Sequence, residues 1–126
     1  MLTQSLEDYL EAIKIIENEK GIVRVKDIGD FLNVKSPSVV TALNTLSSKG
    51  YIKQEKYSNV HLTSKGRKKA EKIYQKHLVI VKFLTQILKV PLSIAKKDAC
   101  KIEHVISKET YEKILSLLEK REAKTD

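Results

Sequence analysis

The chain has 126 residues and a mass of 14.4 kDa, which limits it to one domain or to one small domain with an appended interaction module. Apolar residues make up 41% and charged residues 32%, with four Gly and two Pro, which excludes a disordered or fibrous protein and favours a helical one. No apolar run approaches the roughly 18 residues of a membrane span, and the opening MLTQSLEDYLEA is acidic where a signal peptide is basic. We therefore expect a cytoplasmic protein.

The net charge of +8 is unevenly distributed along the chain. Residues 53–76 hold eight Lys or Arg and two acids, whereas residues 1–20 hold five acids and two lysines. A local basic segment attracts polyanions such as nucleic acids, although a solvated lysine-rich face is an alternative interpretation. The single cysteine, Cys100, excludes an intramolecular disulfide.

Residues 1–50 predict three helices. Apolar side chains recur at helical spacing in residues 4–19 and 25–32, and Gly21 ends the first of these helices. A third helix is expected from Ser36, as its N-cap, to Gly50. The predicted inward stripes are Leu6, Leu10, Ile13 and Ile16 in the first helix, Val25, Ile28, Phe31 and Leu32 in the second, and Val39, Val40, Leu43 and Leu46 in the third.

After Gly50 the apolar period changes from 3.6 to 2, so YIKQE and NVHLT predict the two strands of a hairpin. A long helix should follow, capped by Thr63 or Ser64 and ending at about Leu88, and then two short helices over residues 92–106 and 108–121. We expect a mainly α protein. Residues 1–72 should form a winged helix-turn-helix of three helices and a two-stranded β-hairpin wing, followed by a helical domain in residues 73–126.

A tight turn before a helix that opens with small polar residues is typical of a DNA-reading helix-turn-helix, whose second helix enters the major groove. The candidates for base edges are Lys35, Ser36, Pro37, Ser38, Thr41 and Asn44. The candidates for phosphates are Lys56, Tyr57, Ser58, His61, Lys65 and Arg67. The pattern predicts binding to double-stranded DNA, although winged helices also serve as protein-interaction modules.

The two short helices near the C-terminus carry apolar stripes that one long helix cannot cover. Pairing with the same helices of a second chain would bury them, so we expect a homodimer. The predicted contact residues are Ile102, Val105, Tyr111, Ile114, Leu115 and Leu118.

The segment Cys100-Lys101-Ile102-Glu103-His104 places a thiol, a carboxyl and an imidazole one helical turn apart, at metal-ligand reach. A buried free cysteine beside an exposed Glu-His pair is the alternative. Asp8 and Glu11 also share one helical face, but acidic pairs at this spacing are mostly solvated. His77 by itself is more typical of a structural histidine.

Taken together, these segments resemble the diphtheria toxin repressor and manganese transport regulator (DtxR/MntR) family. The resemblance covers nearly the whole chain and rests on SLEDYLEAI, RVKDIGDFLNVKSPSVV, EKYSNVHLTSKG, His77 and CKIEH, in the family's order and spacing. It implies a homodimeric repressor, not an enzyme, that is activated by Mn(II) or Fe(II) and binds palindromic operators of metal-uptake genes. The metal ligands that the resemblance implies are Asp8, Glu11, His77, Cys100, Glu103 and His104, so that the first helix would also contribute ligands.

The chain departs from both branches of that family. Manganese members commonly have Glu at the position of Cys100, and iron members usually have Met at the position of Asp8. Because a thiolate favours softer ions and carboxylates favour harder ones, the ligand chemistry does not choose between Mn(II) and Fe(II). The chain would be a short form without the C-terminal SH3-like domain.

Two other functions fit parts of the pattern. One is a metal-independent winged-helix regulator, in which the acidic residues and the Cys-Glu-His segment have no ligand role. The other is a small metal-dependent hydrolase, against which stand the lack of a HExxH motif and of a nucleophile-base arrangement.

Overall fold

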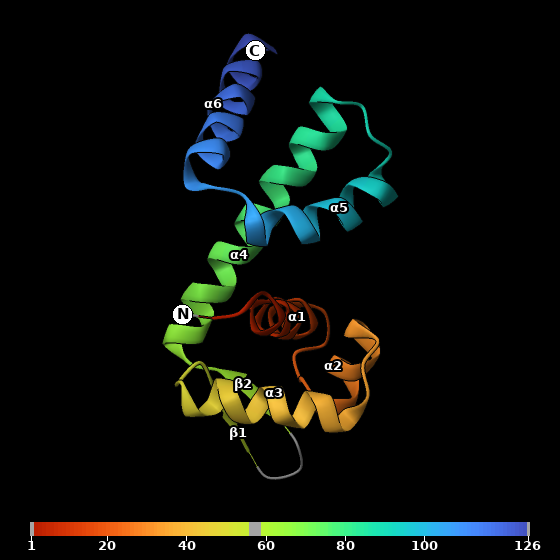
Figure 1. Cartoon of the computed structure of the whole chain (residues 1–126), viewed down its shortest axis with the longest axis vertical. Coiled ribbons are helices and arrows are strands. Elements are labelled where there is room, and N and C mark those ends of the chain that lie inside the picture. The colour runs from red at the N-terminus through yellow and green to blue at the C-terminus, as the bar shows by residue number, and fades with distance from the viewer. Residues whose placement is uncertain (1, 56–58, 126) are drawn as a thin grey trace. The chain divides into compact units, whose positions relative to one another are not determined.

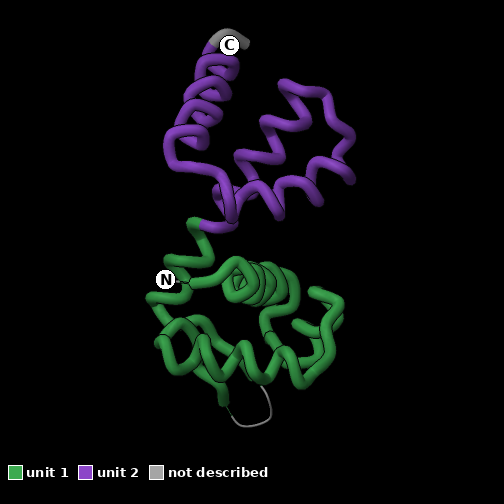
Figure 2. Tube along the Cα trace, viewed as in Figure 1, with its two compact units in different colours: residues 1–72 green, residues 73–126 purple. Residues whose placement is uncertain are grey.

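The computed structural model describes residues 2–55 and 59–125. The chain forms two compact units, an N-terminal unit of residues 1–72 and a C-terminal unit of residues 73–126 (Figure 2). Among the described residues, no helix is both long enough and apolar enough to cross a membrane.

The N-terminal unit is a winged helix-turn-helix, which confirms the predicted fold class (Figure 1). Its elements are α1 (Gln4–Lys20), α2 (Val25–Leu32), α3 (Ser36–Ser48), β1 (Ile52–Gln54), β2 (Val60–Leu62) and the first part of α4 (Ser64–Lys82). The two strands pair antiparallel, with Ile52 opposite Leu62. On its other side β2 is joined to the segment before α2, because Val60 N donates to Val23 O at 2.9 Å. The wing is therefore attached directly to the helix-turn-helix.

One core holds this unit together. Each helix and each strand contributes at least one fully buried aliphatic side chain, so removing any element would expose apolar surface. The buried residues are Tyr9, Leu10, Ile13, Ile16, Val23, Ile28, Val39, Leu43, Leu46, Ile52, Val60, Leu62 and Ala70.

Three details of the predicted helix-turn-helix are wrong. The N-cap of α3 is Lys35, and Ser36 is already helical. Phe31 is 48% exposed and Val40 is 44% exposed, although both were expected to face inward. The reason is helical geometry, since each of them lies about a quarter turn or more away from the centre of its helix's buried arc.

The C-terminal unit contains the rest of α4, a wider π-helical turn η2 (Phe83–Ile87), α5 (Leu92–Val105) and α6 (Lys108–Thr125). Ile80 and Leu84 pack against Ala95 and Ala99 of α5. The small alanine side chains allow close approach of α5. On α4, Ile80 is buried, whereas Leu78 is exposed.

Local caps define where the helices of both units begin. Thr63 Oγ1 accepts from Gly66 N at 3.1 Å at the start of α4, and Ser107 Oγ accepts from Thr110 N at 3.1 Å at the start of α6. Both caps were predicted. The helical segment also ends at about Leu88 as predicted, but the π-helical form of its last turn, in which Leu88 N donates to Phe83 O, was not expected.

Gly66 provides a test of how α4 is joined to the wing. A Cβ atom added at this position would collide with the backbone carbonyl of Tyr51, which cannot move without shifting the end of α3. We expect Gly66→Ala to lower the free energy of unfolding by about 1 to 3 kcal/mol, measured by urea denaturation. Lys72→Ala, at an exposed position on the same helix, is the control and should have little effect. Equal stability of the two variants would contradict this packing.

Candidate metal centre and nucleic-acid interface

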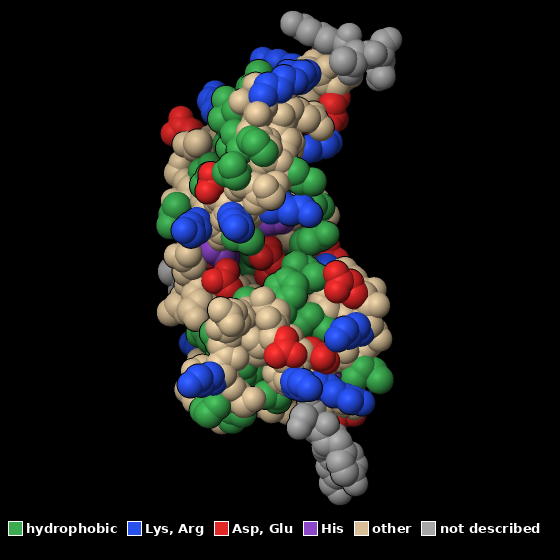
Figure 3. Space-filling model, turned by 90° about the vertical axis from the view of Figure 1, so that its right-hand side faces the viewer, with side chains coloured by type: hydrophobic (Ala, Val, Ile, Leu, Met, Phe, Trp, Pro, Cys, Tyr) green, Lys and Arg blue, Asp and Glu red, His purple; other side chains and the backbone are tan. Residues whose placement is uncertain are grey.

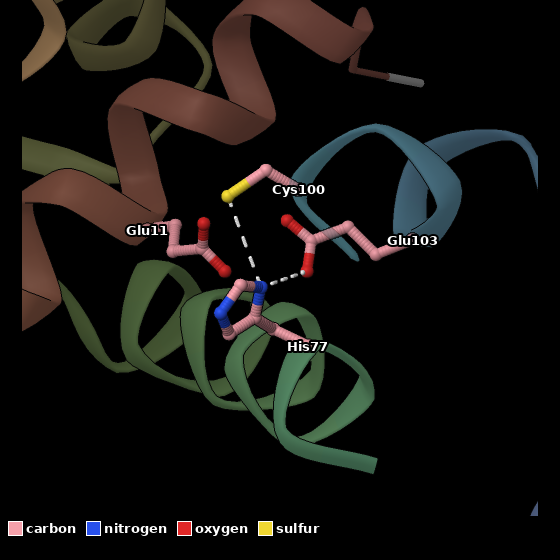
Figure 4. A group of neighbouring side chains, drawn as sticks. All are labelled: Glu11, His77, Cys100 and Glu103. Atoms are coloured by element: carbon pink, nitrogen blue, oxygen red, sulfur yellow. Dashed lines mark hydrogen bonds and ion pairs between the residues drawn. The ribbon is translucent and has the colours of Figure 1, made fainter. Parts of the chain in front are cut away.

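Three potential metal ligands meet in the C-terminal unit. His77 comes from α4, and Cys100 and Glu103 come from successive turns of α5 (Figure 4). One ligand atom of each lies within 4.8 Å of the others. His77 Nδ1 is 3.1 Å from Glu103 Oε2 and 3.9 Å from Cys100 Sγ.

The packing of α4 on α5 explains why these side chains meet. His77 precedes Ile80 and Leu84 on one stripe of α4, and Glu103 follows Ala95 and Ala99 on one stripe of α5. Each polar residue lies about one helical turn beyond the apolar side chains by which α4 and α5 pack together, which form the apolar seam. The packing of these side chains therefore also brings the imidazole and the carboxylate together.

Glu103 lies between two imidazoles. Its side chain is 0% exposed, with Oε2 facing His77 Nδ1 and Oε1 lying 3.4 Å from His104 Nε2. Among the described residues, no group donates a hydrogen bond to Oε1. A buried carboxylate needs a cation or protonated partner, so this site can accept positive charge.

The sequence left open a purely structural alternative, in which a buried Cys100 lies beside an exposed Glu103 and His104, and the observed burial is the opposite. Cys100 is exposed, whereas the side chains of Glu103 and His104 are buried. A structural cysteine beside a solvated Glu-His pair would show the reverse. Imidazole nitrogen, thiolate sulfur and carboxylate oxygen together suit a first-row divalent transition metal, so the residues fit such an ion.

The other two predicted ligands, Asp8 and Glu11, belong to the N-terminal unit. They lie three residues apart on α1, and their carboxyl groups therefore share one side of this helix. Their role as ligands stays a prediction.

The predicted base-reading residues lie on α3 and the turn before it. Lys35, Ser36 and Ser38 are exposed, as are three further residues along α3, Pro37, Thr41 and Asn44. Thr41 Oγ1 donates to Pro37 O at 3.0 Å. A groove of about 480 Å³ runs beside this face, lined by Ser5, Leu6, Tyr9, Pro37, Ser38, Thr41, Ala42 and Thr45.

The sequence did not reveal that Gln54 on β1 contacts Asn44, which lies on the face of α3 that carries the predicted base-reading residues (the recognition face). Gln54 Nε2 donates to Asn44 Oδ1 at 3.4 Å. No local pattern predicts this contact, because it depends on how the wing folds back on α3.

Several of the predicted phosphate-binding residues have partners within the N-terminal unit. Arg67 forms two hydrogen bonds to Glu17, at 2.7 and 3.2 Å, and these bonds with the Glu17 charge raise the pKa of Arg67. Lys65 Nζ donates to Lys49 O, and His61 Nε2 lies 3.4 Å from Glu55. The remaining candidates in the wing, Lys56, Tyr57 and Ser58, lie outside the described residues.

The surface charge is mixed on the face drawn in Figure 3, where Lys and Arg side chains lie among Asp and Glu side chains. Ion pairs with acids of α1, such as Arg67–Glu17 and Lys69–Glu7, partly neutralise the basic charge of residues 53–76.

The predicted dimer residues differ in exposure. Val105 is 74% exposed, and Ile102, Tyr111, Ile114 and Leu115 are half-buried. Leu118 is buried within the chain, although the sequence analysis placed it in the uncovered stripe. Exposed apolar side chains that the sequence analysis missed are Leu88, Leu92, Ile94 and Leu117.

Comparison with known proteins covers both halves of the chain. Residues 1–60 match the family model of the iron dependent repressor, N-terminal DNA binding domain, and residues 63–125 match the iron dependent repressor, metal binding and dimerisation domain. A helix-turn-helix-type transcriptional regulator of Methanocaldococcus jannaschii is 35% identical over 120 residues, which cover 94% of this chain and 96% of that protein.

Two solved structures are similar over 94% of this chain. IdeR of T. acidophilum has a TM-score of 0.82 and 27% identity, and the manganese regulator SloR has a TM-score of 0.81 and 26% identity. The match spans 55% of each of those chains, so this chain covers about half their length.

These findings confirm the resemblance drawn from the sequence. The two family models match in chain order and assign DNA binding to the first part of the chain, and metal binding and dimerisation to the second. The chain therefore belongs to the iron-dependent repressor family of metal-dependent, DNA-binding transcriptional regulators.

Proposed function

We propose that this protein is a homodimeric repressor of metal-uptake genes that binds a palindromic operator in the cytoplasm when Mn(II) or Fe(II) occupies its ligand cluster. The observation that carries the proposal is the convergence of His77, Cys100 and Glu103, in a chain whose other unit is a winged helix-turn-helix. Among the described residues of its unit, the ion-pair partners of the buried Glu103 carboxylate are the imidazoles of His77 and His104, and a bound cation would match its charge more fully.

The ligand set of the proposed site includes residues of both units. Asp8 and Glu11 would add carboxylate oxygens from α1 to those of Glu103, with His77, Cys100 and His104 as the other ligands. The helix α1 is part of the N-terminal core through Tyr9 and Leu10, so a ligand on α1 cannot shift without moving the recognition helix. When bound, a divalent cation supplies the positive charge and coordination bonds that these groups require.

The proposed regulation follows from charge. Brought together without a cation, the carboxylates of Asp8, Glu11 and Glu103 repel one another, and this repulsion favours separated units. Occupation of the cluster would select the arrangement in which both recognition helices of a dimer fit DNA. Linkage then requires operator DNA to strengthen metal binding by the same factor as metal strengthens operator binding.

The metal is proposed to be Mn(II) or Fe(II), and the donor types support both. Cys100 and the two imidazoles favour the softer Fe(II), whereas carboxylates suit Mn(II). The similar protein SloR is described as a manganese regulator.

For DNA, we propose that α3 and the turn before it lie in the major groove with Lys35, Ser36, Pro37, Ser38, Thr41 and Asn44 toward base edges. The wing residues Lys56, Tyr57, Ser58 and His61 are proposed to contact phosphates. Arg67 could reach a phosphate only by giving up its two bonds to Glu17. A two-fold dimer would place two such helices about 34 Å apart, in successive major grooves.

The direct test is operator affinity with and without metal. The duplex is selected from a random library by Mn(II)-loaded wild-type protein, and affinity is then measured under anaerobic conditions with Mn(II), with Fe(II) and with a chelator. We expect metal to strengthen binding by about 5- to 150-fold. Glu103→Gln keeps the shape of the side chain but removes its charge, so it should abolish this gain.

The control for that experiment is Glu109→Gln, which changes the same residue type at an exposed position of α6. It should respond to metal as the wild type does. Far-UV circular dichroism shows whether each variant is folded. If the chelated wild type binds the selected duplex as tightly as the metal-loaded protein, the chain is not a metal sensor.

The recognition face is tested by Thr41→Ala and Asn44→Ala. Each removes hydrogen-bonding groups that face outward from α3, so each should reduce discrimination between the selected duplex and random DNA by about 1 kcal/mol or more. Gel-shift titrations with both duplexes measure this difference. Ser116→Ala on α6 is the control, and unchanged discrimination in both α3 variants would defeat the assignment.

The proposed dimer is tested by light scattering. The wild type should have twice the 14.4 kDa chain mass, and Leu115→Asp should lower it, because a carboxylate in an apolar interface is left without a partner. Lys113→Asp alters charge at an exposed position of the same helix and should leave the mass unchanged. A monomeric wild type with full operator affinity would rule out the dimer.

A further inference from the structure

The last residues of α3 are held by the residues that begin α4. Lys65 Nζ donates to Lys49 O at 2.8 Å, and Lys49 is the C-cap of α3. The final carbonyls of a helix lack intrahelical donors and carry partial negative charge, so an ammonium group binds them favourably. Lys65 therefore acts as a side-chain cap on the recognition helix.

A second contact fixes the same ammonium group. Lys65 Nζ lies 4.4 Å from the centroid of the Tyr51 ring, within the range of a cation–π interaction. Tyr51 packs against the buried core of the N-terminal unit. The lysine is thus oriented by one group at the end of α3 and by another that is itself anchored in the core.

Thr63 donates hydrogen bonds to the next two backbone carbonyls after Lys49. Thr63 Oγ1 donates to Gly50 O at 2.6 Å, and Thr63 N donates to Tyr51 O at 3.0 Å. Together with the bond to Lys49 O, residues 63–65 satisfy the carbonyls of residues 49–51 in turn. Of the three bonds, only the one to Lys49 depends on a long, charged side chain.

We propose that Lys65 is a positioning residue that sets the orientation of α3 toward DNA, and that it does not serve as a phosphate contact. The inference rests on the proposed function only in placing α3 against DNA. To reach a phosphate, the ammonium group would have to leave both Lys49 O and the Tyr51 ring, and the end of α3 would lose its cap.

The two roles of Lys65 have different signatures in DNA binding. Loss of a phosphate contact weakens all duplexes alike and reduces the salt slope by about 1. Loss of a positioning contact lowers affinity for the operator more than for random DNA and leaves the salt slope unchanged. Conservative replacement also distinguishes them, since an arginine at this position can still donate to Lys49 O and stack on Tyr51.

The DNA experiment compares wild-type protein, Lys65→Met, Lys65→Arg and the control Lys72→Met, all loaded with Mn(II). Lys72 is exposed two turns further along α4, and its replacement removes the same charge. Relative to Lys72→Met, Lys65→Met should bind the selected duplex about threefold to tenfold more weakly, with equal affinity for random DNA and an equal salt slope. Lys65→Arg should recover most of the loss. Equal weakening on both duplexes with a reduced salt slope would overturn the proposal.

Amide hydrogen exchange of the free protein gives a readout that needs neither DNA nor metal. Lys65→Met should speed exchange in the last turn of α3 and at residues 50–51, whereas Lys72→Met should not. Unchanged exchange would overturn the proposal even if operator affinity fell. Failure of the wild type to bind DNA would contradict the proposed function, but the exchange result would still decide whether Lys65 holds α3.

Discussion

A buried carboxylate must be matched by positive charge, and among the described residues of the C-terminal unit the ion-pair partners of Glu103 are the imidazoles of His77 and His104. The apolar seam between α4 and α5 creates this situation, because it buries the turn that carries Glu103 together with His77. A divalent cation bound by these groups would satisfy the same requirement, which a fully apolar seam would not have.

The two units have separate cores, and this separation makes regulation by a small ion feasible. In the N-terminal unit, α1, α3 and the wing share one set of buried side chains, so the recognition helix moves only with the unit as a whole. The proposed ligands on α1, Asp8 and Glu11, would therefore act on that whole unit. The contacts at residues 49–51 serve the same end, because they prevent the end of α3 from moving independently of α4.

Local patterns in the sequence predicted most of the fold and only part of the site. The bounds of α2 and the caps at Thr63 and Ser107 follow from residues close together in the chain, as does the spacing of Cys100 and Glu103. The contact of His77 with Glu103 joins residues 26 positions apart, and no periodicity predicts it. The same limit applies to Arg67, whose partner Glu17 lies 50 positions away.

The central claim is that the ligand cluster and operator binding are thermodynamically coupled. The most direct test is a calorimetric titration of the apoprotein with Mn(II), carried out in the presence and in the absence of the selected duplex under anaerobic conditions. The account predicts that the duplex strengthens Mn(II) binding by the same factor, about 5- to 150-fold, by which Mn(II) strengthens duplex binding. Equal Mn(II) affinity with and without the duplex would contradict it.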